Sequence, residues 1–171
     1  MKFLRGALYF LVVALLLSSC GYHLAGYGST LPSHIRTISI PVFKNSSSEP
    51  NIQRDATDVI RRAFISDGRL KVADTRKADL LIRGTLTDYQ LRAVAFNSAD
   101  SAEEYVVRLG IQVEAYDRIK KKIIFNQKFT TQWDYRATSS VVDSQLEKNI
   151  ALREAYDDLA DRLVSIIIEQ F

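Results

Sequence analysis

The residue whose type and setting best fit covalent chemistry is Cys20. It is the only cysteine of the 171-residue chain, and it follows Leu17-Ser18-Ser19 where an apolar run from Gly6 to Leu17 ends. This four-residue stretch resembles the bacterial lipobox, in which the cysteine thiol takes a diacylglyceryl group before the chain is cut. We therefore predict lipidation of Cys20 and signal cleavage between Ser19 and Cys20. The alternative is an ordinary signal peptide with a chance cysteine at its end.

The segment before Cys20 has the features of a secretory signal. Two cations, Lys2 and Arg5, precede the apolar run. A membrane-spanning helix needs roughly 20 apolar residues, so the run is too short to remain as a span. We predict that residues 1–19 form a lipoprotein signal peptide and that acyl chains such as palmitate on Cys20 hold the chain at a membrane. Gly21, where an aspartate would retain a lipoprotein at the inner membrane, favours the outer membrane.

The rest of the composition argues against several function classes. Loss of Lys2 and Arg5 takes Lys+Arg from 23 to 21 against 20 acidic residues, so the net charge falls from +3 to +1. A near-neutral domain does not fit general nucleic-acid binding. His23 and His34 are the only histidines, and with one cysteine they give neither a zinc-ligand pattern nor a nucleophile elbow. We expect no catalytic residue, no metal and no cofactor, with both histidines in tether or capping roles.

The only basic cluster is Lys120-Lys121-Lys122, at the tip of a predicted hairpin. Two interpretations stay open for it. It is a solvated turn whose charges discourage association between strand edges, or it contacts an anion such as a lipid phosphate. Four aromatic residues at alternating positions nearby favour core packing beneath a helix over a binding platform: Phe125, Phe129, Trp133 and Tyr135.

Periodicity predicts the elements that position these residues. Alternating apolar residues predict a strand over 35–43, which Pro41 places at an edge or ends early. A polar loop at 44–50 then leads to a helix over 52–67, with Ser48 or Asn51 as its N-cap and Gly68 just after its end. A short strand is possible at 70–73.

Three long strands and a second helix follow. The strands are predicted over 80–93, with a bulge near Asp88 where the apolar phase changes, over 105–117, and over 123–135 with Ile123 on the apolar face. The helix is predicted from Asp143 to about Gln170, with Leu146 and Ile150 in its apolar stripe. At ~3.3 Å per residue, strands of this length make the domain elongated.

This order predicts an α+β fold, with two helices packed on one face of a sheet of about four strands (β-α-β-β-β-α). We assign residues 20–34 to a lipidated tether and residues 35–171 to a single domain. The uncovered sheet face is expected to be polar and to carry Arg83, Thr85, Thr87, Arg108, Gln112, Glu114, Asn126, Lys128, Thr130 and Gln132.

An ordered set of short motifs along the whole chain resembles the lipopolysaccharide-assembly lipoprotein family (LptE-type). The motifs are Cys20-Gly21-Tyr22-His23-Leu24, Leu31-Pro32, Ile38-Ser39-Ile40-Pro41, Asn45 to Pro50, Phe64-Ile65, Asp67-Gly68-Arg69-Leu70, Ala78-Asp79-Leu80 and Ala155-Tyr156-Asp157.

The resemblance implies a non-enzymatic lipoprotein at the periplasmic side of the outer membrane. Its domain would sit as a plug inside a large β-barrel translocon (LptD-type), help that barrel assemble, and support lipopolysaccharide insertion into the outer leaflet. Contact with lipopolysaccharide itself is possible. Some members carry cations in the loop between the first two long strands, whereas 97–104 here holds three acids and no cation. Lys120-Lys121-Lys122 would be a substitute for those cations.

A second reading, from a different class, is a periplasm-facing lipoprotein that serves as an auxiliary binding module of an envelope transporter or secretion complex. An enzyme is the third.

Overall fold

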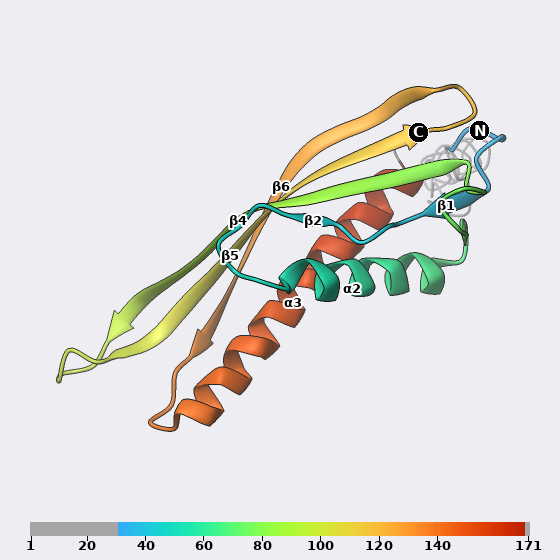
Figure 1. The fold of residues 1–171 in the computed structure, drawn as a ribbon. Coiled ribbons are helices and arrows are strands. Elements are labelled where there is room, and N and C mark those ends of the chain that lie inside the picture. The colour runs from blue at the N-terminus through green and yellow to red at the C-terminus, as the bar shows by residue number, and fades with distance from the viewer. Residues whose placement is uncertain (1–30, 170–171) are drawn as a thin grey trace, which may run out of the picture.

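The computed structural model describes residues 31–169, which form one sheet with both helices on the same face (Figure 1). The strands are β1 (Thr37–Ser39), β2 (Lys44–Asn45), β3 (Lys71–Val72), β4 (Leu80–Phe96), β5 (Ala102–Asp117) and β6 (Lys122–Arg136). The helices are α2 (Ile52–Asp67) and α3 (Val141–Glu169). The predicted α+β class is confirmed. The sheet has six strands and not about four, because it also contains two short strands of two residues each, β2 and β3.

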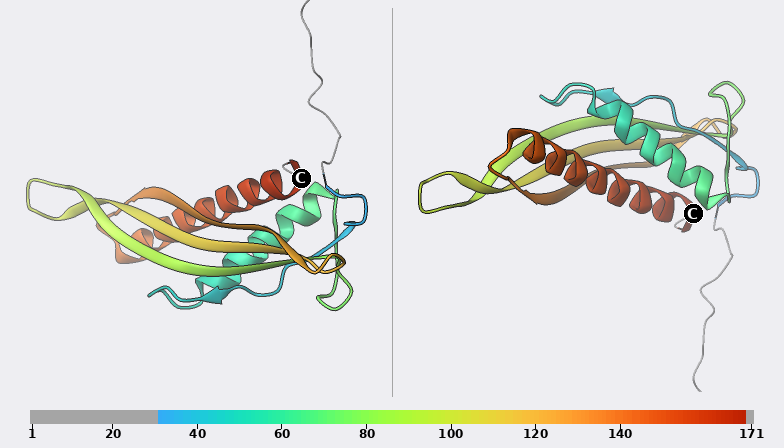
Figure 2. Two further views of the ribbon diagram at one scale, coloured as in Figure 1. Left: turned by 90° about the horizontal axis from the view of Figure 1, so that it is seen from above. Right: turned by 90° about the horizontal axis from the view of Figure 1, so that it is seen from below.

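The strand order is β3-β1-β4-β5-β6, with β2 beside the middle of β4. β1 runs parallel to β3 and β4, whereas the three long strands form an antiparallel meander. Seen from above in Figure 2 the strands lie in front of the helices, and seen from below the helices lie in front. The molecule therefore has a helix-covered sheet face and an uncovered one, as a two-layer α+β fold requires.

Helix α2 has the predicted bounds. Its apolar stripe is buried at Ala56, Ile60 and Phe64, and Gly68 ends it in the left-handed conformation (φ 73°), donating its N–H to the Phe64 carbonyl at 3.3 Å. The expected side-chain N-cap is wrong. Asn51 occupies the cap position at φ 66° without a capping hydrogen bond from its side chain.

The long strands contain the predicted bulge and three register shifts that the sequence did not reveal. The register of β4 against β5 shifts between Leu86 and Asp88, as the phase change predicted, and shifts twice more between Ala93 and Phe96. In β6, a shift separates the pairs Ala115–Phe125 and Tyr116–Ile123. It turns Ile123 to the uncovered face, where it is 51% exposed, so its assignment to the apolar face is wrong.

Core packing of the β6 aromatic residues is confirmed. Phe125 is 7% exposed and stacks on Phe129 with ring centres 5.9 Å apart, while Trp133 and Tyr135 are partly buried against the same core. The buried Thr131 hydroxyl donates to the Asp158 carboxylate at 2.7 Å, which ties β6 to α3. The helix-covered face of the sheet is therefore a packed interior.

Helix α3 is packed along only part of its length. Its buried residues begin at Ala151, whereas Leu146 is 57% exposed and Ile150 is 44% exposed. Their expected burial is wrong because the first turns of α3 extend beyond the start of α2 (Figure 1). Neither helix within residues 31–169 is both long and apolar enough to cross a membrane.

The first strand is much shorter than the predicted 35–43. β1 ends at Ser39, before Pro41, and the chain continues along the same edge of β4 until Lys44 and Asn45 pair with Thr85 and Leu86. The Phe43 ring of this segment lies on Gly84, which leaves no room for a side chain there. Leu31, in the segment assigned to the tether, is buried in the core, so this end of the tether contacts the domain.

Candidate functional site

The uncovered sheet face is polar, as predicted. None of the ten residues expected there is buried, and the strand register places them in rows such as Arg83–Glu114–Asn126. Arg83 lies 3.3 Å from the Glu114 carboxylate, and the Gln112 amide donates to the Asn126 side-chain oxygen at 2.6 Å. Both charge signs occur on this face. It is therefore suited to water or to a polar protein surface and not to lipid chains.

A hollow of about 550 Å³ opens on this face beside the segment that joins β1 to β2. Pro41 and Val42 form one wall, and Arg83, Thr85 and Gln112 belong to the lining on the sheet side. Val42 is 56% exposed here. The hollow gives the polar face a local depression with an apolar rim.

Two carboxylates join the chain segments that meet at the amino-terminal end of the domain. The Asp117 carboxylate accepts from the His34 ring at 2.7 Å and from the backbone N–H groups of Ile119 and Lys120 at 2.9 Å each. The Asp79 carboxylate accepts from the backbone N–H groups of Arg36 and Thr37 at 3.0 Å and from the Thr37 hydroxyl at 2.7 Å. The incoming chain, the β3–β4 turn and the β5–β6 hairpin are thus joined.

Both carboxyl groups have a lowered pKa. Burial acts in the opposite direction and raises the pKa of Asp117, but the N–H of Lys120, the His34 ring and the N–H of Ile119 together outweigh it. Burial likewise raises the pKa of Asp79, and the hydrogen bonds from Thr37 and Arg36 outweigh it. These are structural carboxylates that stay ionised at neutral pH.

The His34 ring is therefore a hydrogen-bond partner of the buried Asp117 carboxylate. Among the described residues no group of three or more His, Cys, Asp or Glu side chains could hold a metal ion. Ser19, Cys20 and His23 lie outside residues 31–169, so the predicted lipidation and cleavage positions are not among the residues that the structure describes.

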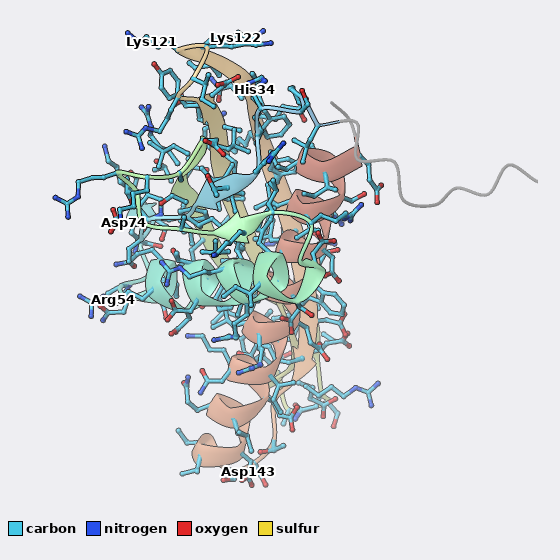
Figure 3. All side chains as sticks on the ribbon, turned by 90° about the vertical axis from the view of Figure 1, so that its right-hand side faces the viewer. His34, Arg54, Asp74, Lys121, Lys122 and Asp143 are labelled. Atoms are coloured by element: carbon cyan, nitrogen blue, oxygen red, sulfur yellow. The ribbon has the colours of Figure 1, made fainter. Side chains whose placement is uncertain are left out.

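Lys120-Lys121-Lys122 lies in the β5–β6 hairpin, as predicted, and all three side chains are exposed. Figure 3 shows Lys121 and Lys122 near His34 at one end of the molecule, with Asp143 at the opposite end. The turn at 97–101, between β4 and β5, lies at the far end of the long hairpin in Figure 1. The lysines therefore do not substitute for cations in that turn.

The far end has an apolar surface that sequence reasoning missed. On the first turns of α3, Val141 is 87% exposed and Val142 is 78% exposed; on the end of β4, Phe96 is 60% exposed. Between these elements lies a crevice of about 390 Å³, whose lining includes Tyr105 and Tyr135, with ring centres 5.4 Å apart and stacked. Exposed apolar side chains gathered in this way mark surfaces that another molecule covers.

Comparison with known proteins gives one family match and several structural neighbours. The family model LptE, described as Lipopolysaccharide-assembly, matches residues 35–167. No curated protein sequence matches the chain.

Three solved lipoprotein structures share the fold at low sequence identity. An uncharacterized lipoprotein B from Nitrosomonas europaea is 12% identical, with 83% of this chain and 91% of that chain covered and a TM-score of 0.56. A minor lipoprotein from Acinetobacter baumannii is 17% identical, with 80% and 92% covered and a TM-score of 0.54. The rare lipoprotein B from Shewanella oneidensis is 16% identical, with 72% and 90% covered and a TM-score of 0.52.

Proposed function

Since the chain belongs to the LptE family of lipopolysaccharide-assembly proteins, we propose that it is a non-enzymatic outer-membrane lipoprotein. In this role it plugs a β-barrel lipopolysaccharide translocon and assists the assembly of that barrel. It thereby supports lipopolysaccharide insertion into the outer leaflet. The observation that carries the proposal is the extent of the family match, which takes in every strand, α2 and all but the last two residues of α3.

The uncovered sheet face supports a position inside a barrel. The lumen of a large outer-membrane barrel is polar, and this face presents uncharged polar groups and both charge signs, including the Arg83–Glu114 pair. A lipid-facing surface would instead need a continuous apolar band. The polar face thus has the chemistry of a surface that meets a barrel interior.

The length of the domain also supports the plug role. β4 has 17 residues, which at ~3.3 Å per residue extend to about 56 Å. A bilayer with its headgroups is about 40–45 Å thick. One domain of this length is able to reach through the membrane-embedded part of a barrel, and the exposed apolar side chains at its far end supply contacts there.

The proposed anchor fits the direction of the chain. Leu31 is the eleventh residue after Cys20, and an extended chain spans at most about 3.6 Å per residue. The domain therefore begins within about 40 Å of an acylated Cys20. Its amino-terminal end would lie at the periplasmic end of the barrel, beside the leaflet that holds the acyl chains, and the turn at 97–101 would point toward the outer leaflet.

Affinity isolation separates this proposal from the auxiliary-module alternative. A tagged chain is recovered from detergent-solubilised outer membranes, and its partners are examined by electrophoresis with and without heating. The proposal predicts a large heat-modifiable barrel in near-equal molar amount. Recovery alone, or with inner-membrane transporter components, would contradict it and favour the module. Depletion of the chain is expected to leave the barrel misassembled, so normal levels of folded barrel would count against the assembly role.

A further inference from the structure

Three segments that are distant in sequence form one surface at the amino-terminal end of the domain. They are residues 32–37, the turn at 73–79 and the hairpin at 118–123, and we call them together the basal surface. The Lys71 N–H donates to the Arg36 carbonyl at 3.1 Å, and the Arg118 N–H donates to the Asp79 carbonyl at 2.9 Å. The Arg118 guanidinium also donates to the carbonyls of Ala78 and Thr75. The segments are therefore held in fixed positions relative to one another.

The basal surface has an excess of positive charge. The exposed cations on or beside its segments are Arg36, Lys71, Arg76, Lys77, Lys120, Lys121 and Lys122. Asp79 and Asp117 are occupied by the hydrogen bonds described above, and the exposed Asp74 lies 3.7 Å from Arg76. In the neighbouring loop, Asp67 and Arg69 pair at 2.6 Å, and Glu169 at the end of α3 adds one negative charge. The carboxylates of Asp74, Asp79, Asp117 and Glu169 offset part of this charge, and the cations remain in excess.

Two apolar side chains accompany the lysines. Ile119 is 53% exposed and Ile123 is 51% exposed, one on each side of Lys120-Lys121-Lys122. The shift in register that turns Ile123 away from the core is what brings it to this surface. Cations next to exposed aliphatic side chains are typical of segments that lie at a membrane interface, where the cations meet headgroups and the aliphatic groups enter the boundary with the acyl chains.

We propose that the basal surface binds anionic phospholipid headgroups of the leaflet that carries the acyl anchor, with Lys120-Lys121-Lys122 and Ile119 as the principal contacts. The base of the plug is then held against headgroups at the periplasmic end of the barrel and does not swing freely on its tether. Charge polarity along the molecule supports this orientation, because the opposite end has Asp100, Glu103 and Glu104 at or next to its turn. The proposed orientation of the basal surface toward the membrane rests on the acyl anchor of the proposed function. The proposed affinity of this surface for anionic lipid does not rest on it.

Vesicle binding by an acyl-free chain tests the proposal. The chain from residue 20 onward, with Cys20→Ser, is mixed with phosphatidylcholine vesicles that contain or lack phosphatidylglycerol, and the bound fraction is measured by sedimentation. Each cation near an anionic surface strengthens binding by roughly fivefold. We expect binding to the anionic vesicles alone, a loss of at least about tenfold when Lys120, Lys121 and Lys122 are all replaced by Gln, and weakening by salt.

A matched variant controls for total charge. Arg54→Gln, Arg92→Gln and Lys128→Gln remove three exposed cations from elsewhere on the domain, and this variant is expected to bind within about twofold of the parent chain. An equal loss in both triple variants would overturn the proposal. Binding that is indifferent to phosphatidylglycerol, or that occurs with lipopolysaccharide micelles but not with the anionic vesicles, would also overturn it. Circular dichroism confirms that each variant is folded.

A labelled chain gives a second readout that does not depend on the triple variant. Cys20→Ser removes the only cysteine of the chain, so a cysteine at Ile119 or at Ser98 takes an environment-sensitive fluorophore at one position. With anionic vesicles we expect a blue shift from the label at residue 119 and none from the label at residue 98. The reverse result, or equal shifts, would contradict contact of the vesicle with the basal surface. The assay contains no acyl chain and no barrel, so its outcome is independent of the isolation experiment above.

Discussion

The His34 ring nitrogen Nε2 lies 2.7 Å from Oδ2 of Asp117, a residue 83 positions away whose side chain is only 1% exposed. The other oxygen of the same carboxylate accepts the N–H groups of Ile119 and Lys120. One buried carboxylate therefore fixes both the incoming chain and the hairpin that carries the lysines. The orientation of the basal surface depends on this group.

Replacing Asp117 is expected to reduce stability in a pH-dependent manner. Because its folded pKa is lowered, the carboxylate contributes stability that is fully present above its unfolded pKa of about 3.9 and is lost as the pH falls through the folded pKa. Asp117→Asn should lower the free energy of unfolding by about 1–3 kcal/mol at pH 7, since hydrogen bonds to a buried charged group are lost. Urea unfolding measures this value.

The pH profile distinguishes this cause from a general packing defect. Between about pH 5 and pH 3, the parent chain should lose more stability than Asp117→Asn. The free energies of unfolding of the two proteins should therefore converge as the pH falls. A difference that stays constant with pH would contradict the assignment. Asp100→Asn, in the exposed turn at positive φ where asparagine is tolerated, is the control and should change stability by less than about 0.5 kcal/mol.

Gly84 is expected to tolerate no side chain. An added Cβ would lie 2.5 Å from both Cγ and Cδ2 of Phe43, whose ring is 3% exposed and whose N–H donates to the buried Thr57 hydroxyl. Gly84→Ala should therefore cost about 1–3 kcal/mol by overpacking. Thermal or urea unfolding measures the loss.

A double variant tests the named contact. Phe43→Leu alone leaves a cavity, but in combination with Gly84→Ala the smaller side chain makes room for the new methyl group. The combined loss should be smaller than the sum of the two single losses. Strictly additive losses would show that the contact with Phe43 is not the cause.

The exposed apolar residues of α3 are expected to affect partner binding without affecting stability. Val142→Ser with Leu146→Ser should change the free energy of unfolding by less than about 1 kcal/mol, because both side chains are exposed. The same change should reduce the amount of barrel recovered by affinity isolation. Leu159→Ala, at a residue that is 1% exposed, should instead cost about 2–5 kcal/mol. Unchanged recovery of the barrel with the double serine variant would contradict a role for this surface.

Much of the fold could be predicted because the signals were local. Helix α2 has an apolar stripe that ends at a glycine, and β4 has a phase change where its bulge lies. The errors involve information that is not local. The two-residue strand β2 has no periodic pattern, and Leu146 shares the helical stripe of buried residues although α2 does not reach it. Periodicity shows which residues share a face, not whether another element covers that face.

The polar sheet face could be predicted from the sequence, whereas the basal surface could not. The polar sheet face followed from alternation, and the family followed from short motifs along the chain. The basal surface did not, because it depends on two sets of strand pairs. Pairing of β1 with β3 and β4 brings residues 32–37 to the turn at 73–79, and pairing of Leu80 with Asp117 brings that turn to the β5–β6 hairpin. The hydrogen bond between His34 and Asp117 could not be deduced from the sequence, because the two residues are 83 positions apart.

Lipidation of Cys20 stays a prediction that one measurement decides. Intact-mass spectrometry of the chain purified from membranes should give a species that begins at Cys20 and carries diacylglyceryl and acyl groups. Cys20→Ser should give an unacylated chain that keeps its signal peptide, because lipidation of the thiol precedes cleavage. A free thiol at Cys20, or a retained signal peptide, would contradict the anchor.

Site-specific photocrosslinking in living cells tests whether the uncovered sheet face meets the interior of a β-barrel partner. The photoreactive residue replaces Gln132, an exposed residue of β6 on that face. If this face meets the barrel, we predict one dominant crosslink, to a large heat-modifiable outer-membrane barrel. Crosslinks to inner-membrane components, or none to any barrel while the chain is folded and membrane-bound, would contradict it.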